Sequence, residues 1–568
     1  MREPINNLIS KIVNFSEKNP RTTRNVIVSK ELAKHIKKFH QKTRTLQNTL
    51  QDSIMKLIEK KSIVLETAHQ PNFFPYSGIF KKAIFLEHIA QKLEKKGHSV
   101  VCLFSIVDTD FADDIWFASN RFPHLSKNGY MKIGMKIAKK DRKKCMYAIQ
   151  RPSQDTWEKI TESLIVHYNT YLKDLDREFS KNNISGFKQN IEIPFQEKRE
   201  DLLDLLEQSY QKADNFADMN SIFLCNVIND LMNCSTVFFK YSDGLNAFEE
   251  SFSRLLSHNN DYIQLYNRFA AQFNLEKIQE KYAPFWYHCT SCEGKVSLQQ
   301  RGKELKGTCQ SCKKLFIIDI ENKDSPNLSG IIKRISPRAI PRHYITFDGI
   351  GISFYSGGYA GAQYTSIAEK IAEILHFRFP PMFTWYNKDY YTGVLQFISF
   401  LQINRILKLD SYDQFLPKYG DLKTHTSQEV EELFYQIESL ETEKTSLQHS
   451  LIHSQDKESK SRIISQLREI TAQERKLKIQ IQQVENKISI IDNAIESFRI
   501  FPSIIDYLLN MNALSLSEQW LYFLNTIEPS IAKPQLLKTN FSKFLRSKFL
   551  WLKNFENNIE NLTTKNHI

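Results

Sequence analysis

The chain has 568 residues, of which 41% are hydrophobic and 25% are charged. This composition excludes an intrinsically disordered chain and a small disulfide-rich scaffold, and the length predicts several domains because a single core rarely grows beyond about 300 residues. The net charge of +13 favours anionic partners such as phosphorylated substrates or nucleic acid. That charge is spread along the chain, however, so a solvated basic surface explains it more simply.

The first 60 residues predict a polar helical lead-in, with packing positions that include Leu32, Ile36 and Leu50. Residues 1–7 lack the apolar core of a signal peptide, and no apolar run is long enough to span a bilayer. We therefore expect a cytoplasmic protein that makes no membrane contact. Four of the eight cysteines are scattered, which argues against a disulfide framework in so long a chain.

Residues 62–116 predict the unit around which the chain is organised. A β-favouring run at 62–68 ends in a loop at 69–78 whose two prolines and glycine prevent a continued strand, a helix follows to Gly97, and 100–107 is an apolar run typical of a strand covered on both faces. The unit opens a core predicted at 61–285, which contains a mostly helical insertion at 153–275.

Polar residues stand where both of these strands end. His69, Asp108 and Asp110 would therefore line one site, since ligands of open α/β sheets bind beyond the carboxyl ends of the strands. His69 would serve as acid or base, and the two aspartates would hold an ammonium group or a metal-bound nucleotide. Gln70 and Asn72 in the same loop are candidate substrate ligands. Equally, the loop residues can simply shape a turn, with Asp110 capping the next helix.

The sharpest local motif is a pair of Cys-x2-Cys turns. Four thiolates in this spacing complete a closed tetrahedral shell for zinc, which leaves no open position for a substrate. We predict a zinc ribbon at 286–318 with a structural ion, inserted between the two parts of the core. The four predicted ligands are Cys289, Cys292, Cys309 and Cys312.

The second part of the core is predicted at 319–420. The sequence favours strands at 344–347 and 349–355, then a glycine-rich loop and a helix from about Ser366. This order would bring backbone N–H groups to an anion, although the same glycines could only permit a tight turn. Two arginines upstream could pair with carboxylate or phosphate. The candidate anion ligands are Gly357, Gly358, Gly361, Arg338 and Arg342.

Residues 427–498 show a heptad pattern in two runs. Lys444 interrupts the first run and Glu474 the second, and the polar segment 453–460 separates them. The break predicts an antiparallel coiled-coil hairpin, and polar residues elsewhere in the heptads favour an exposed arm over a buried bundle. The remaining residues, 499–568, predict C-terminal helices that dock on the core.

The order of these parts resembles the BshC family, the cysteine-adding enzymes of bacillithiol synthesis. Three motifs carry the resemblance, at residues 68–74, at 107–110, and at 358–364 running on to 377–381. The resemblance implies a Rossmann-like core related to nucleotidyltransferase folds, dimerisation through the coiled coil, and condensation of cysteine with a glucosaminyl malate. ATP or ADP is then a candidate cofactor. The first loop alone is also similar to the WbqC-like sugar-pathway family.

Several positions depart from the family pattern. The usual Glu-Asp-His-Asp becomes Val107-Asp108-Thr109-Asp110, and the usual Gly-Pro-Gly-Glu becomes Gly358-Tyr359-Ala360-Gly361. The predicted ribbon is an insertion that ordinary members lack. Two hypotheses therefore remain open: a ligase that adds cysteine or another amino compound to a small sugar-derived acceptor, and a non-catalytic protein that binds nucleic acid or a protein partner on a degenerate enzyme core.

Overall fold

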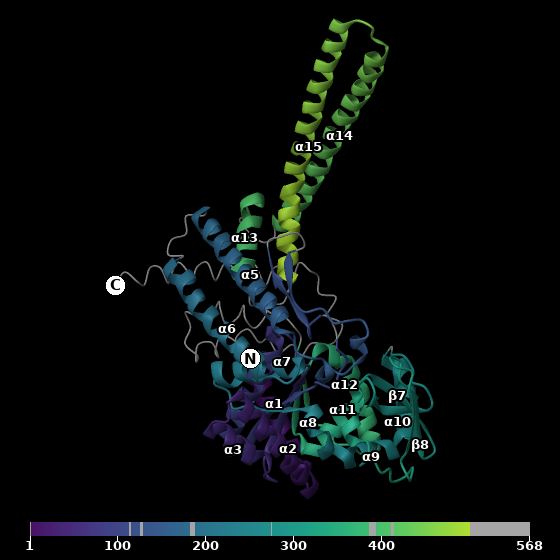
Figure 1. The fold of residues 1–568 in the computed structure, drawn as a ribbon. Coiled ribbons are helices and arrows are strands. Elements are labelled where there is room, and N and C mark those ends of the chain that lie inside the picture. The colour runs from purple at the N-terminus through teal and green to yellow at the C-terminus, as the bar shows by residue number, and fades with distance from the viewer. Residues whose placement is uncertain are drawn as a thin grey trace, which may run out of the picture.

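The computed structural model describes residues 2–112, 115–124, 129–181, 188–273, 275–385, 394–409 and 414–499. Within these ranges the body of the molecule contains two five-stranded sheets and one two-stranded sheet, and a long helical hairpin projects from it (Figure 1). The C-terminal helices expected at 499–568 lie outside the described residues, except for Arg499 at the end of the hairpin.

A parallel five-stranded sheet forms the centre of the body. Its strands run in the order β12 (Met382–Trp385), β11 (Phe354–Gly358), β1 (Ile63–His69), β2 (Val100–Ile106) and β5 (Val237–Lys240). From β1 the chain continues outward through β2 to β5, but β11 and β12 are added on the opposite side. The strand order therefore reverses between β1 and β11. The α/β class with a parallel sheet is confirmed.

Helices cover both faces of this sheet. α1 (Arg2–Lys18) and α4 (Ser77–Glu94) pack on one face, while α2 (Thr23–Thr43), α3 (Asn48–Leu57) and α12 (Tyr359–Leu375) pack on the other. Every residue of β2 is buried, as expected for a strand enclosed on both sides. Because α4 and α12 each follow a parallel strand, both helices begin at the carboxyl edge of the sheet.

Helices also make up most of the segment between β2 and the second sheet, as the sequence predicts. A two-stranded hairpin of β3 (Ser119–Pro123) and β4 (Tyr130–Gly134) precedes them. The helices are α5 (Gln154–Lys181), α6 (Ile193–Lys212), α7 (Phe216–Asn226), the single turn α8 (Tyr241–Gly244), α9 (Glu249–Ser257) and α10 (Asn259–Ala270).

The four paired cysteines lie in a second, antiparallel sheet. Its strands run in the order β10 (Ile335–Pro337), β6 (Tyr282–His288), β7 (Lys295–Arg301), β8 (Glu304–Thr308) and β9 (Leu315–Asp319). This sheet reaches beyond the 286–318 ribbon in both directions, because β6 begins earlier and β10 returns to pair with it.

The strand expected at 344–347 is wrong, and the one expected at 349–355 begins only at Phe354. The segment forms α11 (Ala339–Thr346), followed by a π-helical turn at Phe347–Gly351. Pro341 stands in the first turn of α11, where its missing N–H costs no helical hydrogen bond. Burial of Tyr344 and Ile345 in the core, where the Tyr344 hydroxyl donates to the Ala368 carbonyl of α12, outweighs their preference for extended backbone.

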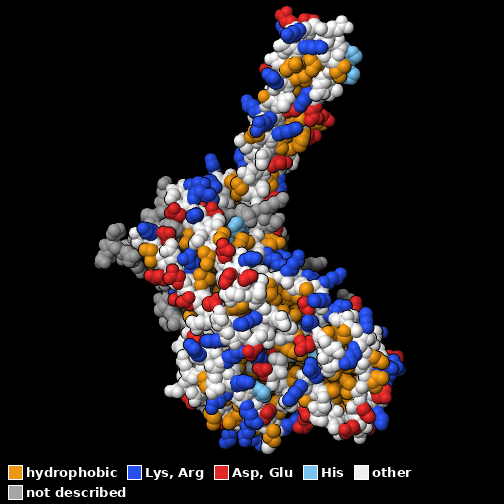
Figure 2. Space-filling model, viewed as in Figure 1, with side chains coloured by type: hydrophobic (Ala, Val, Ile, Leu, Met, Phe, Trp, Pro, Cys, Tyr) orange, Lys and Arg blue, Asp and Glu red, His pale blue; other side chains and the backbone are white. Residues whose placement is uncertain are grey.

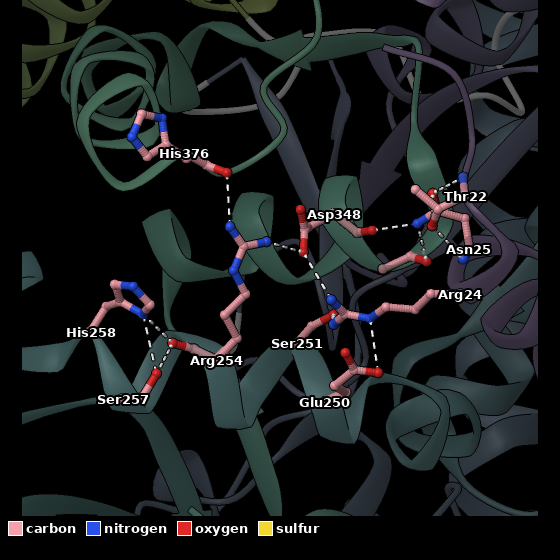
Figure 3. A network of polar contacts seen from close by, with 11 residues as sticks. Thr22, Arg24, Asn25, Glu250, Ser251, Arg254, Ser257, His258, Asp348 and His376 are labelled. Atoms are coloured by element: carbon pink, nitrogen blue, oxygen red, sulfur yellow. Dashed lines mark hydrogen bonds and ion pairs between the residues drawn. The ribbon is translucent and has the colours of Figure 1, made fainter. Parts of the chain in front are cut away.

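A polar network holds the π-helical turn ahead of β11 (Figure 3). The Asp348 carboxylate lies 2.8 Å from Nη1 of Arg254 in α9 and 3.5 Å from Nη1 of Arg24 in α2. Nδ2 of Asn25 donates to the backbone carbonyl oxygens of Asp348 and Gly349. Gly351 adopts φ +81° against the Asn25 side chain, a conformation that favours glycine. Two distant helices thereby fix where β11 begins.

The projecting hairpin consists of α14 (Phe415–His453) and α15 (Lys457–Arg499), with α13 (Val394–Leu407) at its base (Figure 1). Its turn falls within the predicted polar break. Nζ of Lys444 lies 2.8 Å from Oε2 of Glu474, so the two residues that interrupt the apolar heptads face each other. This pairing fixes the register of the hairpin.

Candidate functional site

The end of β1 lies at the reversal of strand order. Thr67 pairs with Ser356 of β11, and the residues two positions further on, His69 and Gly358, are the last of their strands. The structure thus brings the predicted histidine to the predicted glycines, but these form no loop, because α12 begins at Tyr359, directly after β11 and ahead of the helix start expected near Ser366. Gly357 precedes Gly358 in β11, and Gly361 lies in the first turn of α12. Backbone N–H groups at the start of that helix point toward the same edge of the sheet.

The hydrogen bonds of His69 select one tautomer. Nδ1 lies 3.0 Å from the carbonyl oxygen of Gln70 and therefore carries the proton, so Nε2, 3.5 Å from the Tyr76 hydroxyl, is the basic atom. Burial and the nearby charge of Lys82 lower the pKa of His69 to about 3. The ring is neutral at pH 7 with the Nε2 lone pair available, although a pKa this low makes Nε2 a weak base.

Asp110 is a partly exposed acidic group at this edge. Nε2 of Gln70 donates to its Oδ2 at 3.0 Å, and Nη1 of Arg342 lies 3.8 Å from the same oxygen. Nζ of Lys295 lies 3.9 Å from Oδ1, and 32% of the Asp110 side chain is exposed. Three predicted residues, Gln70, Asp110 and Arg342, therefore meet here around one carboxylate that is partly accessible to a ligand.

Asp108 is committed to a different contact. Its carboxylate accepts hydrogen bonds from the backbone N–H and the hydroxyl of Ser242, at the start of α8. The side chain is buried, and burial raises the pKa of Asp108 to about 6 although Lys240 opposes the shift. The structure thus separates the two predicted aspartates: Asp110 faces the ligand edge, while Asp108 joins β2 to α8.

Asn72 and Arg338 also occupy different surroundings from His69. Asn72 is buried in the loop after β1, and its Oδ1 has no hydrogen-bond partner among the described residues. Arg338 donates to the Ala283 carbonyl and the Ser297 hydroxyl and lies 3.7 Å above the centre of the Trp286 ring. Arg338 therefore connects α11 to the antiparallel sheet and is not brought together with the other candidate ligands.

Two ionisable residues at this edge are not among those predicted from the sequence. Glu66 in β1 is buried, and its Oε1 accepts a hydrogen bond from Ser105. Burial raises the pKa of Glu66 to about 8. Lys82 is buried in α4, with Nζ 3.4 Å from the Ala68 carbonyl. A charged residue within an otherwise apolar strand or helix face was the signal that could have identified both.

The four cysteine sulfurs converge as the spacing predicts. All four lie within 4.8 Å of one another. Each pair sits in the same kind of turn: the residue after its second cysteine, Glu293 or Lys313, has positive φ and donates its N–H to the carbonyl of the first cysteine. Burial opposes thiolate formation, but backbone N–H groups of Ser291 and Cys292 outweigh it and lower the pKa of Cys289 to about 7. The cluster could hold a metal ion such as zinc.

The cysteine cluster is connected to the loop after β2. Lys295, three residues after Cys292, is buried and donates from Nζ to the carbonyl oxygen of Thr109 at 2.9 Å. On the other side of the first pair, His288 contacts the Tyr147 hydroxyl at 2.8 Å through Nδ1. The Tyr147 backbone N–H in turn donates to the Asp108 carbonyl. The antiparallel sheet therefore supports the loop that carries Asp110.

No protein-family model matches the chain, and no curated protein matches it at a significant level. Among the described residues, no helix combines the length and apolar character needed to cross a membrane.

Proposed function

We propose that this protein is a BshC-like ligase, which joins cysteine or another amino compound to a small sugar-derived acceptor at the reversal of strand order between β1 and β11. The observation that carries the proposal is the cluster of Gln70, Asp110 and Arg342 beside His69. An exposed carboxylate next to a guanidinium offers complementary charges for the ammonium and carboxylate groups of an amino acid. The neutral imidazole supplies a proton acceptor.

The proposed reaction forms one amide bond. A nucleoside triphosphate such as ATP would first activate the amino acid: a carboxylate oxygen would attack a phosphorus atom and accept the phosphoryl or nucleotidyl group, and ADP or pyrophosphate would leave. The acceptor amine then attacks the activated carbonyl carbon, the C–N bond forms, and the C–O bond to phosphorus breaks with its electron pair on the phosphate. Nε2 of His69 takes the proton lost by the amine, while Asp110 and Arg342 hold the amino acid in place.

We further propose that the core is Rossmann-like and binds a nucleotide. Numbered along the chain within this sheet, the strands lie in the order 3-2-1-4-5, which is the order of the nucleotide-binding Rossmann sheet, whose ligands sit where the order reverses. Zinc in the cysteine cluster would be structural, because four sulfur ligands leave no open coordination position. The metal would stabilise the loop after β2 through Lys295.

Mass spectrometry of a reaction with cysteine, glucosaminyl malate and ATP or ADP tests the ligase proposal. We expect a product whose mass equals the sum of the two substrates minus water. His69→Ala and Asp110→Asn should each lower kcat/KM by about 100-fold or more, since a positioned base contributes this much, whereas Lys96→Met, outside the site, should not. Absence of product from folded, zinc-loaded protein with these and related amino acids would overturn the proposal.

The second hypothesis, a nucleic-acid-binding protein, rests on the exposed lysines of the antiparallel sheet. Lys303, Lys313 and Lys314 are exposed around its turns. Figure 2 shows acidic side chains interspersed with basic ones over the visible face, however, rather than one continuous basic patch. Binding to an unselected oligonucleotide that weakens steeply with salt, and that is lost when these three lysines are replaced, would favour this function.

We propose that the chain dimerises through the α14–α15 hairpin. The hairpin projects from the body, and its surface carries exposed apolar side chains, including Phe434, 55% exposed, and Ile452, 76% exposed. Light scattering should give twice the chain mass for the wild type and a single chain mass for Phe434→Glu. A wild type that is monomeric at micromolar concentration would contradict dimerisation.

A further inference from the structure

Lys82 is a buried amine with few partners. It lies in α4, is 3% exposed, and makes one hydrogen bond, a long one of 3.4 Å to the Ala68 carbonyl. An ammonium group has three donors, and among the described residues no carboxylate lies within ion-pair distance of this one. A buried cation without an anion is costly, so the position favours a negatively charged group, which none of the described side chains provides.

The amine points at the start of α12. A Cβ built on Gly358 would lie 3.8 Å from Nζ of Lys82, and no other heavy atom of the described residues comes within 4 Å of it. Gly358 is the N-cap of a 17-residue helix, makes no side-chain cap hydrogen bond, and is followed by a first turn without acidic residues. The N-cap residue therefore offers these backbone N–H groups no side-chain acceptor, and a glycine at this position takes up no side-chain space in front of them.

Arg342 adds to the positive field at Lys82. Burial and, to a smaller extent, the charge of Arg342 together lower the pKa of Lys82 to about 7. The charges of Lys82 and Arg342 also lower the pKa of His69 after burial. Lys82, Arg342 and His69 are therefore close enough to influence one another's pKa at this edge of the sheet. Asp110 is the carboxylate that faces Arg342.

We propose that Lys82 and the N-terminus of α12 together bind a phosphate group of the ligand, with Gly358 providing the space. A tetrahedral oxyanion has several oxygens that can accept hydrogen bonds from the helix N–H groups and from the ammonium at the same time, and it carries the negative charge that both favour. The inference deepens the proposed ligase function, because the phosphate would belong to the nucleotide that activates the carboxyl group.

Calorimetric titration of the full chain with ADP, with AMP and with inorganic phosphate tests the site. We expect Lys82→Met to weaken ADP binding by about tenfold or more, since a hydrogen bond from a charged donor is lost, while Lys82→Arg retains most of the affinity. Gly358→Ala should weaken binding without disturbing the fold, because φ −91° and ψ 161° suit any residue. Lys96→Met removes an exposed charge just beyond the end of α4, the helix that contains Lys82, and serves as the matched control.

Folding failure can be recognised independently. Methionine has nearly the length of lysine and leaves no buried charge, so the ligand-free Lys82→Met variant should melt at or above the wild-type temperature. Binding of inorganic phosphate alone would identify a general oxyanion site, whereas binding of ADP without phosphate would identify a nucleotide site; either supports the proposal if it depends on Lys82.

Two outcomes would overturn the subsite. The first is ADP and phosphate affinity unchanged in both Lys82→Met and Gly358→Ala, and the second is no binding of any of the three probes to the wild type at millimolar concentration. The ligase proposal fails separately: Lys82-dependent ADP binding without an amide product would retain the subsite and reject the ligase, whereas wild-type product formation by Lys82→Met with unchanged ADP affinity would reject the subsite alone.

Discussion

Nζ of Lys295 lies 2.9 Å from the carbonyl oxygen of Thr109. Lys295 follows the first cysteine pair, and Thr109 lies between Asp108 and Asp110, just after the end of β2. The amine also lies 4.4 Å from the centre of the Phe111 ring, so a buried cation joins the antiparallel sheet to the loop of the candidate site. The cysteine cluster and the parallel sheet are therefore mechanically connected.

Replacing Lys295 should loosen this loop without removing the metal site. In Lys295→Met we expect an unchanged zinc content but faster amide exchange at Met146 and Tyr147, whose N–H groups donate to the carbonyls of Asp110 and Asp108. Loss of the charged hydrogen bond should lower the free energy of unfolding by about 1 to 3 kcal/mol. Lys303→Met, in an exposed turn of the same sheet, is the control, and equal exchange in both variants would disprove the connection.

The cysteine cluster should bind one zinc ion per chain. Metal analysis of Cys292→Ser should show most of that zinc lost, whereas Cys234→Ser, outside the cluster, should retain it. The binding free energy of a structural zinc is on the order of 10 kcal/mol, so chelation should unfold the antiparallel sheet. It should also increase exchange at Tyr147. Zinc that remains bound to Cys292→Ser would rule out the four-sulfur site.

Asp108 and Asp110 should respond differently to substitution. Asp108→Ala leaves the partly buried N–H of Ser242 without its acceptor, so we expect a loss of about 1 to 3 kcal/mol in the free energy of unfolding, measured by urea denaturation. Asp110→Asn, at a partly exposed position, should change stability by less than about 0.5 kcal/mol but should lower substrate affinity. The reverse pattern would mean that Asp108 is the ligand-binding residue.

Glu66 should make stability fall as pH rises. Burial raises its pKa in the folded state from 4.5 to about 8, so between these values the folded state binds more protons than the unfolded state. By linkage, the free energy of unfolding then decreases with increasing pH across that window. Glu66→Gln removes the titration, and its melting temperature relative to the wild type should rise from pH 5 to pH 8. A constant difference between the two proteins would show that Glu66 is ionised when folded.

Much of the architecture is local enough to be predicted from the sequence. The strand, loop and helix at 62–97 and the cysteine turns depend on nearby prolines, glycines and spacing, and the structure contains them. The helical hairpin is different, since in the sequence Lys444 and Glu474 are polar residues that interrupt the apolar pattern of two separate heptad runs. In the structure they form one ion pair of 2.8 Å, which no reading of either run alone could have shown.

The candidate site was harder to predict because strand-end position does not determine side-chain direction. Asp108 and Asp110 are two residues apart, yet Ser242, far along the chain, engages the first and leaves the second accessible. Tertiary burial likewise converts the expected strand at 344–347 into helix α11, which delivers Arg342. Lys82 and Lys295 acquire their importance only from contacts with segments that the sequence does not place beside them.

The central strand of the parallel sheet has consequences for synthesis on the ribosome. β1 pairs with β2 soon after both emerge, but its other neighbour, β11, lies 289 residues further on, as the bond from Thr67 to the Ser356 carbonyl shows. During that interval the nascent chain exposes β1 as an edge strand, with unpaired backbone groups that can recruit other chains. The antiparallel cysteine sheet is completed just before β11 is made, so metal loading during translation would prepare the surface on which the last strands of the core assemble.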